Sequence, residues 1–174
     1  MSTINVDSEV PYRKIKTLAV MRFDDKVIRD KAVKGYIIKT ISNPDAGEML
    51  AEIMTNELLN LRKYDILTRS GIRGKIKAEG VNEEELVNRR DYKGMGKMLD
   101  VDAVVIGKIH SFDLSTMAVY ERGDVSFTAE CIDTNNGKTL WSMEVKESAP
   151  YKDEVELASK VVKKAVEELQ EKID

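Results

Sequence analysis

The sequence is poor in the residues that build metal sites, disulfides and basic surfaces. It has 1 cysteine and 1 histidine in 174 residues, and its 28 Lys and Arg are outnumbered by 31 Asp and Glu. One cysteine cannot form an internal disulfide, and these two residues cannot complete a typical zinc site. Phosphate binding needs a surplus of Lys and Arg on some face. We therefore expect no metal, no cofactor and no nucleic-acid partner.

Long apolar runs are also missing, although the chain has enough hydrophobic residues to form a core. No stretch approaches the roughly 20 apolar residues of a membrane-spanning helix. Hydrophobic residues make up 42% of the chain and charged residues 34%, which is typical of a folded, soluble chain. We expect a single domain over residues 12–174, preceded by a flexible tail over residues 1–11 that could serve as a tether.

Hydrophobic periodicity predicts an α/β (α+β) domain in which helices pack on a mixed sheet, in the order β-α-β-α-β-β-β-α. The expected strands cover residues 16–23, 64–68, 101–112, 117–120, 125–133 and 139–146. The main helices are expected over residues 45–62, from Ser70 to about Gly80, and from Asp153 onward. Capping boxes at Asp45 and Asp153 predict two of these starts.

Two motif fragments have structural interpretations that we favour. Residues 133–137 begin like a calcium loop, but Gly137 stands where an oxygen ligand is needed, and Asn136-Gly137 is typical of a hairpin turn. Residues 94–97 resemble part of a phosphate loop, but Asp91 and Met98 occupy positions that the motif reserves for Gly and Ser/Thr. We expect those glycines to allow close helix packing instead.

Four residues could support catalysis. Cys131 could act as a nucleophile with His110 as its base, but Cys131 shares a strand face with apolar residues, which favours the core. Asp24 and Asp25 follow a central strand, where α/β proteins place ligand-binding carboxylates. Such aspartates are also ordinary turn residues.

Other charged residues can also be interpreted either as functional groups or as ordinary surface residues. Asp113 and Asp133 also end predicted strands, so they have the same two interpretations as Asp24 and Asp25. A local basic patch contains Arg69, Arg73, Lys75 and Lys77. Because Glu79 and residues 83–85 follow it closely, a solvated helix face is favoured.

The stretch from Lys26 to Asn43 fits no helical stripe, and residues 35–41 are its most strand-like part. An edge strand there would expose unpaired backbone groups that another chain could pair with. We predict partner binding at Tyr36 and Ile38, because buried aromatic and apolar anchors carry much of an interface's energy. The alternative is that this is an extra strand covering the domain's own core.

Four blocks in order resemble a known family. They are residues 16–24 (KTLAVMRFD), residues 64–70 (YDILTRS), residues 95–107 (MGKMLDVDAVVIG) and residues 131–142 (CIDTNNGKTLWS). In sequence and spacing they are similar to the CsgG-like outer-membrane lipoproteins, relatives of the curli secretion channel and of LpoB-like activators of penicillin-binding proteins. The match covers residues 16–147.

This resemblance implies an anticodon-binding-like domain that acts by protein–protein contact, without catalysis, in an assembly, secretion or cell-wall-synthesis apparatus. The implied partner is another envelope protein or a second copy of the chain. It also implies a lipidated cysteine before Ser2, a lipid anchor absent from this sequence, and a location on the periplasmic face of the outer membrane. Without such a lipobox the location would be cytoplasmic. Two alternatives are a cytoplasmic enzyme that uses Asp24 and Asp25, and a ring-forming channel subunit.

Overall fold

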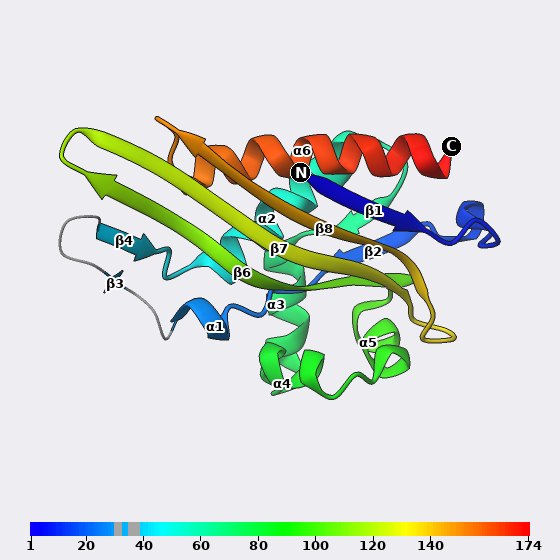
Figure 1. Cartoon of the computed structure of the whole chain (residues 1–174). Coiled ribbons are helices and arrows are strands. Elements are labelled where there is room, and N and C mark those ends of the chain that lie inside the picture. Colours follow the sequence, from blue (N-terminus) through cyan, green and yellow to red (C-terminus); the bar gives the residue numbers. More distant parts are fainter. Residues whose placement is uncertain (30–32, 35–38) are drawn as a thin grey trace.

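The computed structural model describes residues 1–29, 33–34 and 39–174. Its framework is an eight-stranded mixed sheet (Figure 1). Three long strands form an antiparallel meander at its centre: β6 (Ala103–Met117), β7 (Tyr120–Asp133) and β8 (Thr139–Pro150). The predicted fold class, a mixed sheet packed by helices, is confirmed.

Shorter strands extend this meander on both sides. On one side β1 (Ser2–Val6) is antiparallel to β8. On the other side β2 (Thr17–Val20) runs parallel to the first part of β6, and β5 (Asp65–Leu67) runs parallel to β2. The far part of β6 pairs with β4 (Lys39–Ser42), which pairs in turn with β3 (Val33–Lys34).

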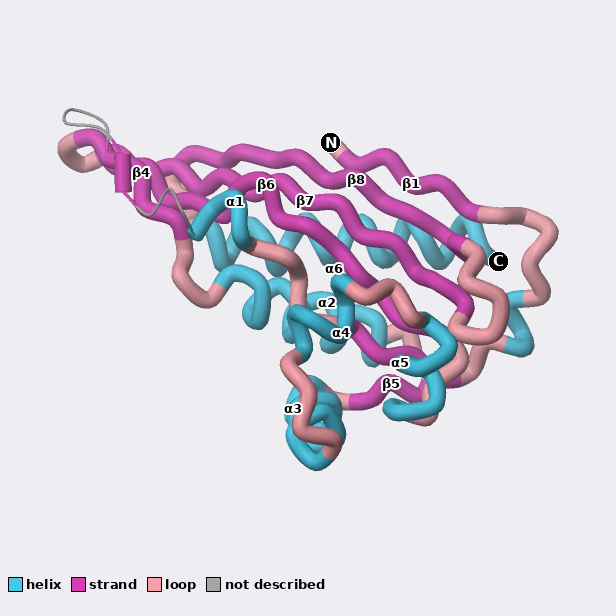
Figure 2. The backbone as a smooth tube through the Cα atoms, turned by 90° about the horizontal axis from the view of Figure 1, so that it is seen from below, coloured by secondary structure: helices cyan, strands magenta, loops and turns pink. Residues whose placement is uncertain are grey.

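Helices cover the two faces of the sheet unequally. The helices α2 (Ala46–Asn60) and α6 (Glu154–Ile173) contact each other and lie across one face. On the opposite side are α3 (Arg69–Ala78), α4 (Glu83–Asn88) and α5 (Tyr92–Leu99) (Figure 2). Two short elements are η1 (Tyr12–Lys14) and α1 (Lys26–Arg29). Within the described ranges, no helix is long and apolar enough to cross a bilayer.

The alternation of side chains along the strands builds an apolar cluster on each face of the sheet. On the side of α2 and α6, the rings of Phe23 and Phe127 meet edge to face with centroids 5.8 Å apart. On the other side, Val104 and Ile132 pack with residues of α3 and α5 such as Met95. Each fully buried side chain of this kind contributes about 1.5–3 kcal/mol to folding.

A β-bulge at His110 changes which residues of β6 face the core. Ile109 pairs with Phe127 and Ser111 pairs with Ser126, so His110 is the extra residue. Ile109 and Phe112 are consequently both buried although they are three positions apart. A bulge of this kind breaks the period of two on which a strand prediction depends.

The predicted break between residues 112 and 117 is wrong, because β6 continues to Met117 before the chain turns. The turn lies at Ala118–Val119 and carries no Gly, Asn or Pro, the residues that identify a hairpin in a sequence. Ala118 has a φ of 53°, as the first central position of a type II′ turn requires. The expected strand over residues 117–120 is therefore the end of the β6–β7 hairpin.

The expectation of a flexible tail over residues 1–11 also differs from the structure, because Ser2–Val6 form the edge strand β1. Ile4 is 4% exposed, and its carbonyl oxygen accepts a hydrogen bond from Lys172 Nζ at 2.6 Å. A lysine that covers the backbone of an edge strand protects it from unwanted pairing. These contacts are long-range, so the short polar segment does not predict them.

The predicted helix starts are confirmed in part. Asp153 accepts a hydrogen bond from the backbone N–H of Glu156 and caps α6 as expected. Asp45 precedes α2 but makes no capping bond with its side chain. Thr68, and not Ser70, caps α3 by accepting a hydrogen bond from Gly71 N.

Candidate protein-contact site

The strand-end carboxylates Asp24 and Asp25 diverge and do not form a pair. Asp25 is 1% exposed, and its two oxygens contact Arg29 Nε at 2.8 Å and Arg22 Nη2 at 2.9 Å. Gly47 N also donates a hydrogen bond to it. Asp24 Oδ1 accepts a hydrogen bond from Lys26 N at the start of α1. Asp25 is thus held in ion pairs that leave it unavailable to a substrate.

The predicted solvated basic face is wrong for Arg69, which is 4% exposed. Its guanidinium donates to Glu48, to Glu83 and to the carbonyl oxygen of Val20. Burial opposes ionisation of Glu48, but the hydrogen bonds and charge of Arg69, together with the charge of Arg73, outweigh it and lower the pKa of Glu48. We call Asp25, Glu48, Arg69, Arg73 and Glu83 the charged cluster. It joins α2, α3 and α4 beyond the end of β2.

Cys131 lies in the core, as the strand pattern predicts. It is buried between Val105 of β6 and Trp141 of β8. Burial raises the pKa of its thiol far above the usual range, so the nucleophilic thiolate does not form. His110 is exposed at the bulge and follows Ile109, whose partner on β7 is Phe127, four positions from Cys131. The two residues do not form a catalytic pair.

The two motif fragments have the structural roles that we favoured. Asp133 and Asn136 accept backbone hydrogen bonds within the β7–β8 turn, where Gly137 has a φ of 72°. Gly96 lies inside α5, and a Cβ there would approach Thr134 to 2.6 Å. Across the described part of the chain, no group of three or more His, Cys, Asp and Glu side chains could hold a metal ion.

Exposed apolar side chains gather at the end of the β6–β7 hairpin. Val119 is 97% exposed, Tyr151 is 77% exposed and Met117 is 44% exposed. The ring of Tyr151 meets that of Tyr120 edge to face at 5.4 Å. We call Met117, Val119, Tyr120 and Tyr151 the tip patch. Figure 1 shows that this end of the sheet projects beyond the start of α6.

The backbone holds the tip patch in a strained conformation. Ala118 and Tyr151 both have positive φ, at 53° and 59°, a region that costs a residue with a Cβ roughly 1–2 kcal/mol. The N–H of Tyr151 donates to Glu121 O at 2.8 Å, which holds the residue beside the hairpin. Strain of this kind persists where the surrounding structure enforces it, and it is frequent at functional sites.

The predicted anchors Tyr36 and Ile38 lie outside the described residues. The described part of the same stretch includes β4, whose Ile41 pairs with Leu114 of β6 and is 40% exposed. β4 therefore joins the sheet in the same half of β6 that carries the tip patch.

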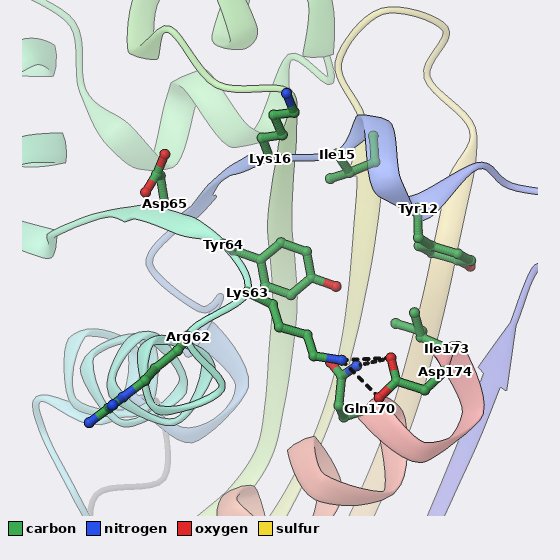
Figure 3. A pocket seen from close by; sticks show the side chains of 10 residues that line it. All are labelled: Tyr12, Ile15, Lys16, Arg62, Lys63, Tyr64, Asp65, Gln170, Ile173 and Asp174. Atoms are coloured by element: carbon green, nitrogen blue, oxygen red, sulfur yellow. Dashed lines mark hydrogen bonds and ion pairs between the residues drawn. The ribbon is translucent and has the colours of Figure 1, made fainter.

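A cleft lies at the opposite end of the molecule, where η1, the start of β5 and the end of α6 meet (Figure 3). Its volume is about 960 Å³. Four of the side chains that line it are apolar or aromatic, and the other six are charged or polar: Tyr12, Ile15, Tyr64 and Ile173, then Lys16, Arg62, Lys63, Asp65, Gln170 and Asp174. Tyr64 points across the cleft toward Tyr12 and Ile173, whereas Arg62 points away. We call this the end cleft.

Polar groups complete the end cleft. Lys63 Nζ contacts both carboxylate oxygens of Asp174, at 2.6 and 2.8 Å, and closes one side. Gln170 donates to the same carboxylate, while its buried Oε1 has no hydrogen-bond partner among the described residues. Burial raises the pKa of Tyr64, and burial followed by the charge of Asp7 raises that of Tyr12 to about 12. Both phenols therefore remain neutral at physiological pH.

Comparison with known proteins identifies the fold. No protein-family model and no curated protein matches the sequence. A PelC dodecamer from Paraburkholderia phytofirmans is similar in structure, with a TM-score of 0.63 at 18% identity over 94% of this chain and 94% of that one. Lipoprotein GNA1162 from Neisseria meningitidis has a TM-score of 0.62 at 16% identity over 90% of this chain and 99% of that one.

A weaker likeness is to the LpoB C-terminal domain from Escherichia coli, with a TM-score of 0.48 at 12% identity over 77% of this chain and 82% of that one. The chain thus has the fold of PelC and of lipoprotein GNA1162. The finer resemblance to CsgG-like proteins stays a prediction.

Neither the tip patch nor the end cleft is predicted by the sequence patterns. In the sequence, Val119 and Tyr120 are apolar residues next to charged ones. The same pattern is typical of an ordinary strand, so it does not identify an exposed patch. The end cleft combines residues separated by up to about 160 positions in the sequence, from Tyr12 to Asp174. No local pattern marks such a combination.

Proposed function

We propose that this chain is a non-enzymatic domain of an envelope assembly that acts by protein–protein contact and self-associates. The tip patch supports this proposal most directly, because strongly exposed apolar side chains at a strained position need a reason to be there. The fold it shares with a protein solved as a dodecamer favours self-association. The internal pairing of Asp25 and the burial of Cys131 remove two groups that an enzyme would have used.

Sedimentation across the micromolar range tests self-association. We expect the average mass to rise with protein concentration for the wild-type chain. A Val119→Arg variant should stay monomeric at the same concentrations, because the cation would have to lose its water at the contact. Thr3→Arg adds the same charge to an exposed position on the open face of the sheet and should behave as wild type. A wild-type chain that remains monomeric throughout would contradict the proposal.

We propose that Tyr36 and Ile38 contribute to the same interface. The support is their position between β3 and β4, since β4 pairs with the half of β6 that leads to the tip patch. The double variant Tyr36→Ala with Ile38→Ala should weaken self-association without changing stability. If only stability changes, the segment covers the domain's own core and the interface assignment fails.

A periplasmic location on the outer membrane is the further part of the proposal. Its support is the fold shared with lipoprotein GNA1162 and the resemblance of four sequence blocks to CsgG-like lipoproteins. Membrane fractionation of the native protein in its own cells, combined with labelled fatty acid, tests it. We expect label and protein together in the outer-membrane fraction, and recovery of unlabelled protein in the cytosol would exclude the location.

A further inference from the structure

Four exposed cations lie close together in the sequence where α4 ends and α5 begins: Arg89, Arg90, Lys93 and Lys97. We call these four residues the cationic patch. None of them forms an ion pair with any residue that the structure describes. The one acidic residue between them is Asp91, whose carboxylate accepts a hydrogen bond from Gly94 N and caps α5. The segment therefore carries an excess of positive charge, although the whole chain has a net charge of -3.

The first carboxylates of α4 are paired away from the cationic patch. Glu83 contacts the buried Arg69, and Glu84 contacts two cations of α1. The exposed Glu85 and Asp100 lie one on each side of the patch in the sequence. Most of the negative charge near the patch is thus neutralised elsewhere or lies at its borders.

The stability of the fold does not explain this arrangement. Lys93 and Lys97 are four positions apart on α5, on the side opposite the buried Met95 and Leu99. Like charges at this spacing repel each other along the helix surface. Lys93 also lies in the first turn of α5, where the helix dipole favours a negative charge. The cluster is therefore better explained by an anionic partner than by the stability of the helix.

The lysines of α6 do not form a comparable surface. Lys160, Lys163 and Lys164 are also exposed. Each has a glutamate four positions away, however, which is a distance at which helix side chains interact: Glu156, Glu167 and Glu168. α6 also lies on the opposite side of the sheet from α4 and α5 (Figure 2). The excess of cations thus distinguishes the α4–α5 side from the mixed surface of α6.

The shape of the cationic patch fits a flat anionic surface. Side chains that project from the outer side of a helix form a convex surface, which lacks the walls that enclose a small ligand. Lys and Arg have long flexible stems, so their charged groups can reach phosphates spread over a plane. Surface clusters of about four to eight such residues are typical of contacts with anionic lipid headgroups. The half-buried Tyr92 lies among them, and tyrosine is frequent at the boundary between a bilayer and water.

We propose that the cationic patch binds the phosphate-bearing headgroups of an anionic bilayer and turns the α4–α5 side of the domain toward it. This inference rests on the proposed outer-membrane location and names the face that meets the membrane. Because the net charge of the chain is -3, the attraction is local and orients the domain. The long strands carry the tip patch away from α4 and α5 (Figure 1), so the membrane contact leaves the tip patch free for self-association.

Cosedimentation of the purified chain with lipid vesicles tests the proposal. One set of vesicles contains phosphatidylcholine alone, and the other also contains anionic phosphatidylglycerol. We expect binding to the second set only. Binding should disappear between about 0.1 M and 1 M salt, where the screening length falls from about 10 to 3 Å. Equal binding to both sets, or no binding to the anionic set, would overturn the proposal, and the second outcome would favour an acidic protein as the partner.

Two matched double variants locate the contact. Lys93→Glu with Lys97→Glu reverses two charges of the patch and should weaken binding to anionic vesicles at least about 25-fold, from about fivefold for each cation. Lys160→Glu with Lys164→Glu makes the same change at the same spacing on α6 and should bind as wild type. Thermal unfolding verifies that both variants fold. Equal losses in the two variants would show a dependence on total charge and exclude the patch.

Failure of the proposed location is a separate result. Recovery of unlabelled native protein in the cytosol would exclude the outer membrane, whereas binding of the purified chain to anionic vesicles would still stand. Labelled protein in the outer-membrane fraction, together with a purified chain that ignores anionic vesicles, would support the location and overturn the role of the cationic patch.

Discussion

The charged cluster and the tip patch are opposite departures from the rule that apolar groups are buried and charged groups are exposed. In the charged cluster, Arg69 and Asp25 are almost completely buried, and partners within the chain neutralise them. At the tip patch, Val119 and Tyr151 are mostly exposed, and nothing described in the chain covers them. The difference shows which side chains have partners within their own chain and which do not. The charges of the charged cluster are paired within the chain, whereas the side chains of the tip patch are exposed, and we propose that another molecule covers them.

The largest expected effect is the loss of Arg69. In Arg69→Met the carboxylates of Glu48 and Glu83 lose their buried partner, and we expect the free energy of unfolding to fall by about 3–5 kcal/mol. Urea denaturation measures this change. Lys77→Met, at an exposed position of the same helix, should cost less than about 0.5 kcal/mol. Equal effects of the two substitutions would show that the charged cluster is no more than a surface feature.

Acid should weaken the charged cluster by a smaller amount. The pKa of Glu48 is lowered in the folded chain, so the unfolded chain binds a proton more readily and stability falls as pH falls. The contribution of Glu48 is complete above its unfolded pKa of about 4.3 and is lost as the pH drops through the lower folded value. Urea denaturation of wild type and Glu48→Gln from about pH 6 to pH 3 measures it. Parallel curves for the two proteins would contradict the assignment.

At the tip patch, relief of backbone strain should raise the free energy of unfolding, whereas the changes to the charged cluster lower it. Ala118→Gly removes the Cβ from a residue with a φ of 53°, and we expect a gain of about 0.5 kcal/mol once the greater freedom of unfolded glycine is subtracted. The matched control is Ala118→Val, which should lose stability because a β-branched residue is least tolerant of positive φ. Thermal unfolding compares the three proteins, and a loss of stability in Ala118→Gly would refute the strain.

The smallest effect on stability is expected at Val119. Val119→Ser should change the free energy of unfolding by less than about 0.5 kcal/mol, because the side chain is 97% exposed. Its self-association should nevertheless weaken. Urea denaturation at low protein concentration and sedimentation at high concentration separate the two quantities. A large loss of stability would mean that Val119 packs within its own chain and that the comparison between the two regions fails.

Much of the fold could be predicted because its signals are local. The stripe along α6 and its cap at Asp153 both depend on residues a few positions apart. The alternation that placed Cys131 in the core is equally local. Where a long-range contact changed a local preference, the prediction was wrong. Glu48, expected in a capping box, is drawn to Arg69 instead, and the bulge at His110 shifts the alternation of β6.

The sequence by itself determined the class of the domain and the burial of its single cysteine, since periodicity and composition decide which residues leave water. Only the tertiary structure decided whether the charged and apolar residues outside the periodic pattern of helices and strands are buried or exposed. Packing beyond the end of β2 turned Arg69 and Asp25 inward as paired charges. The length of the β6–β7 hairpin carried Val119 and Tyr120 past the helices, and chain folding placed Tyr12, Tyr64 and Ile173 around one cleft at the other end. These outcomes depend on contacts between residues far apart in the chain, whose free energies no local pattern encodes.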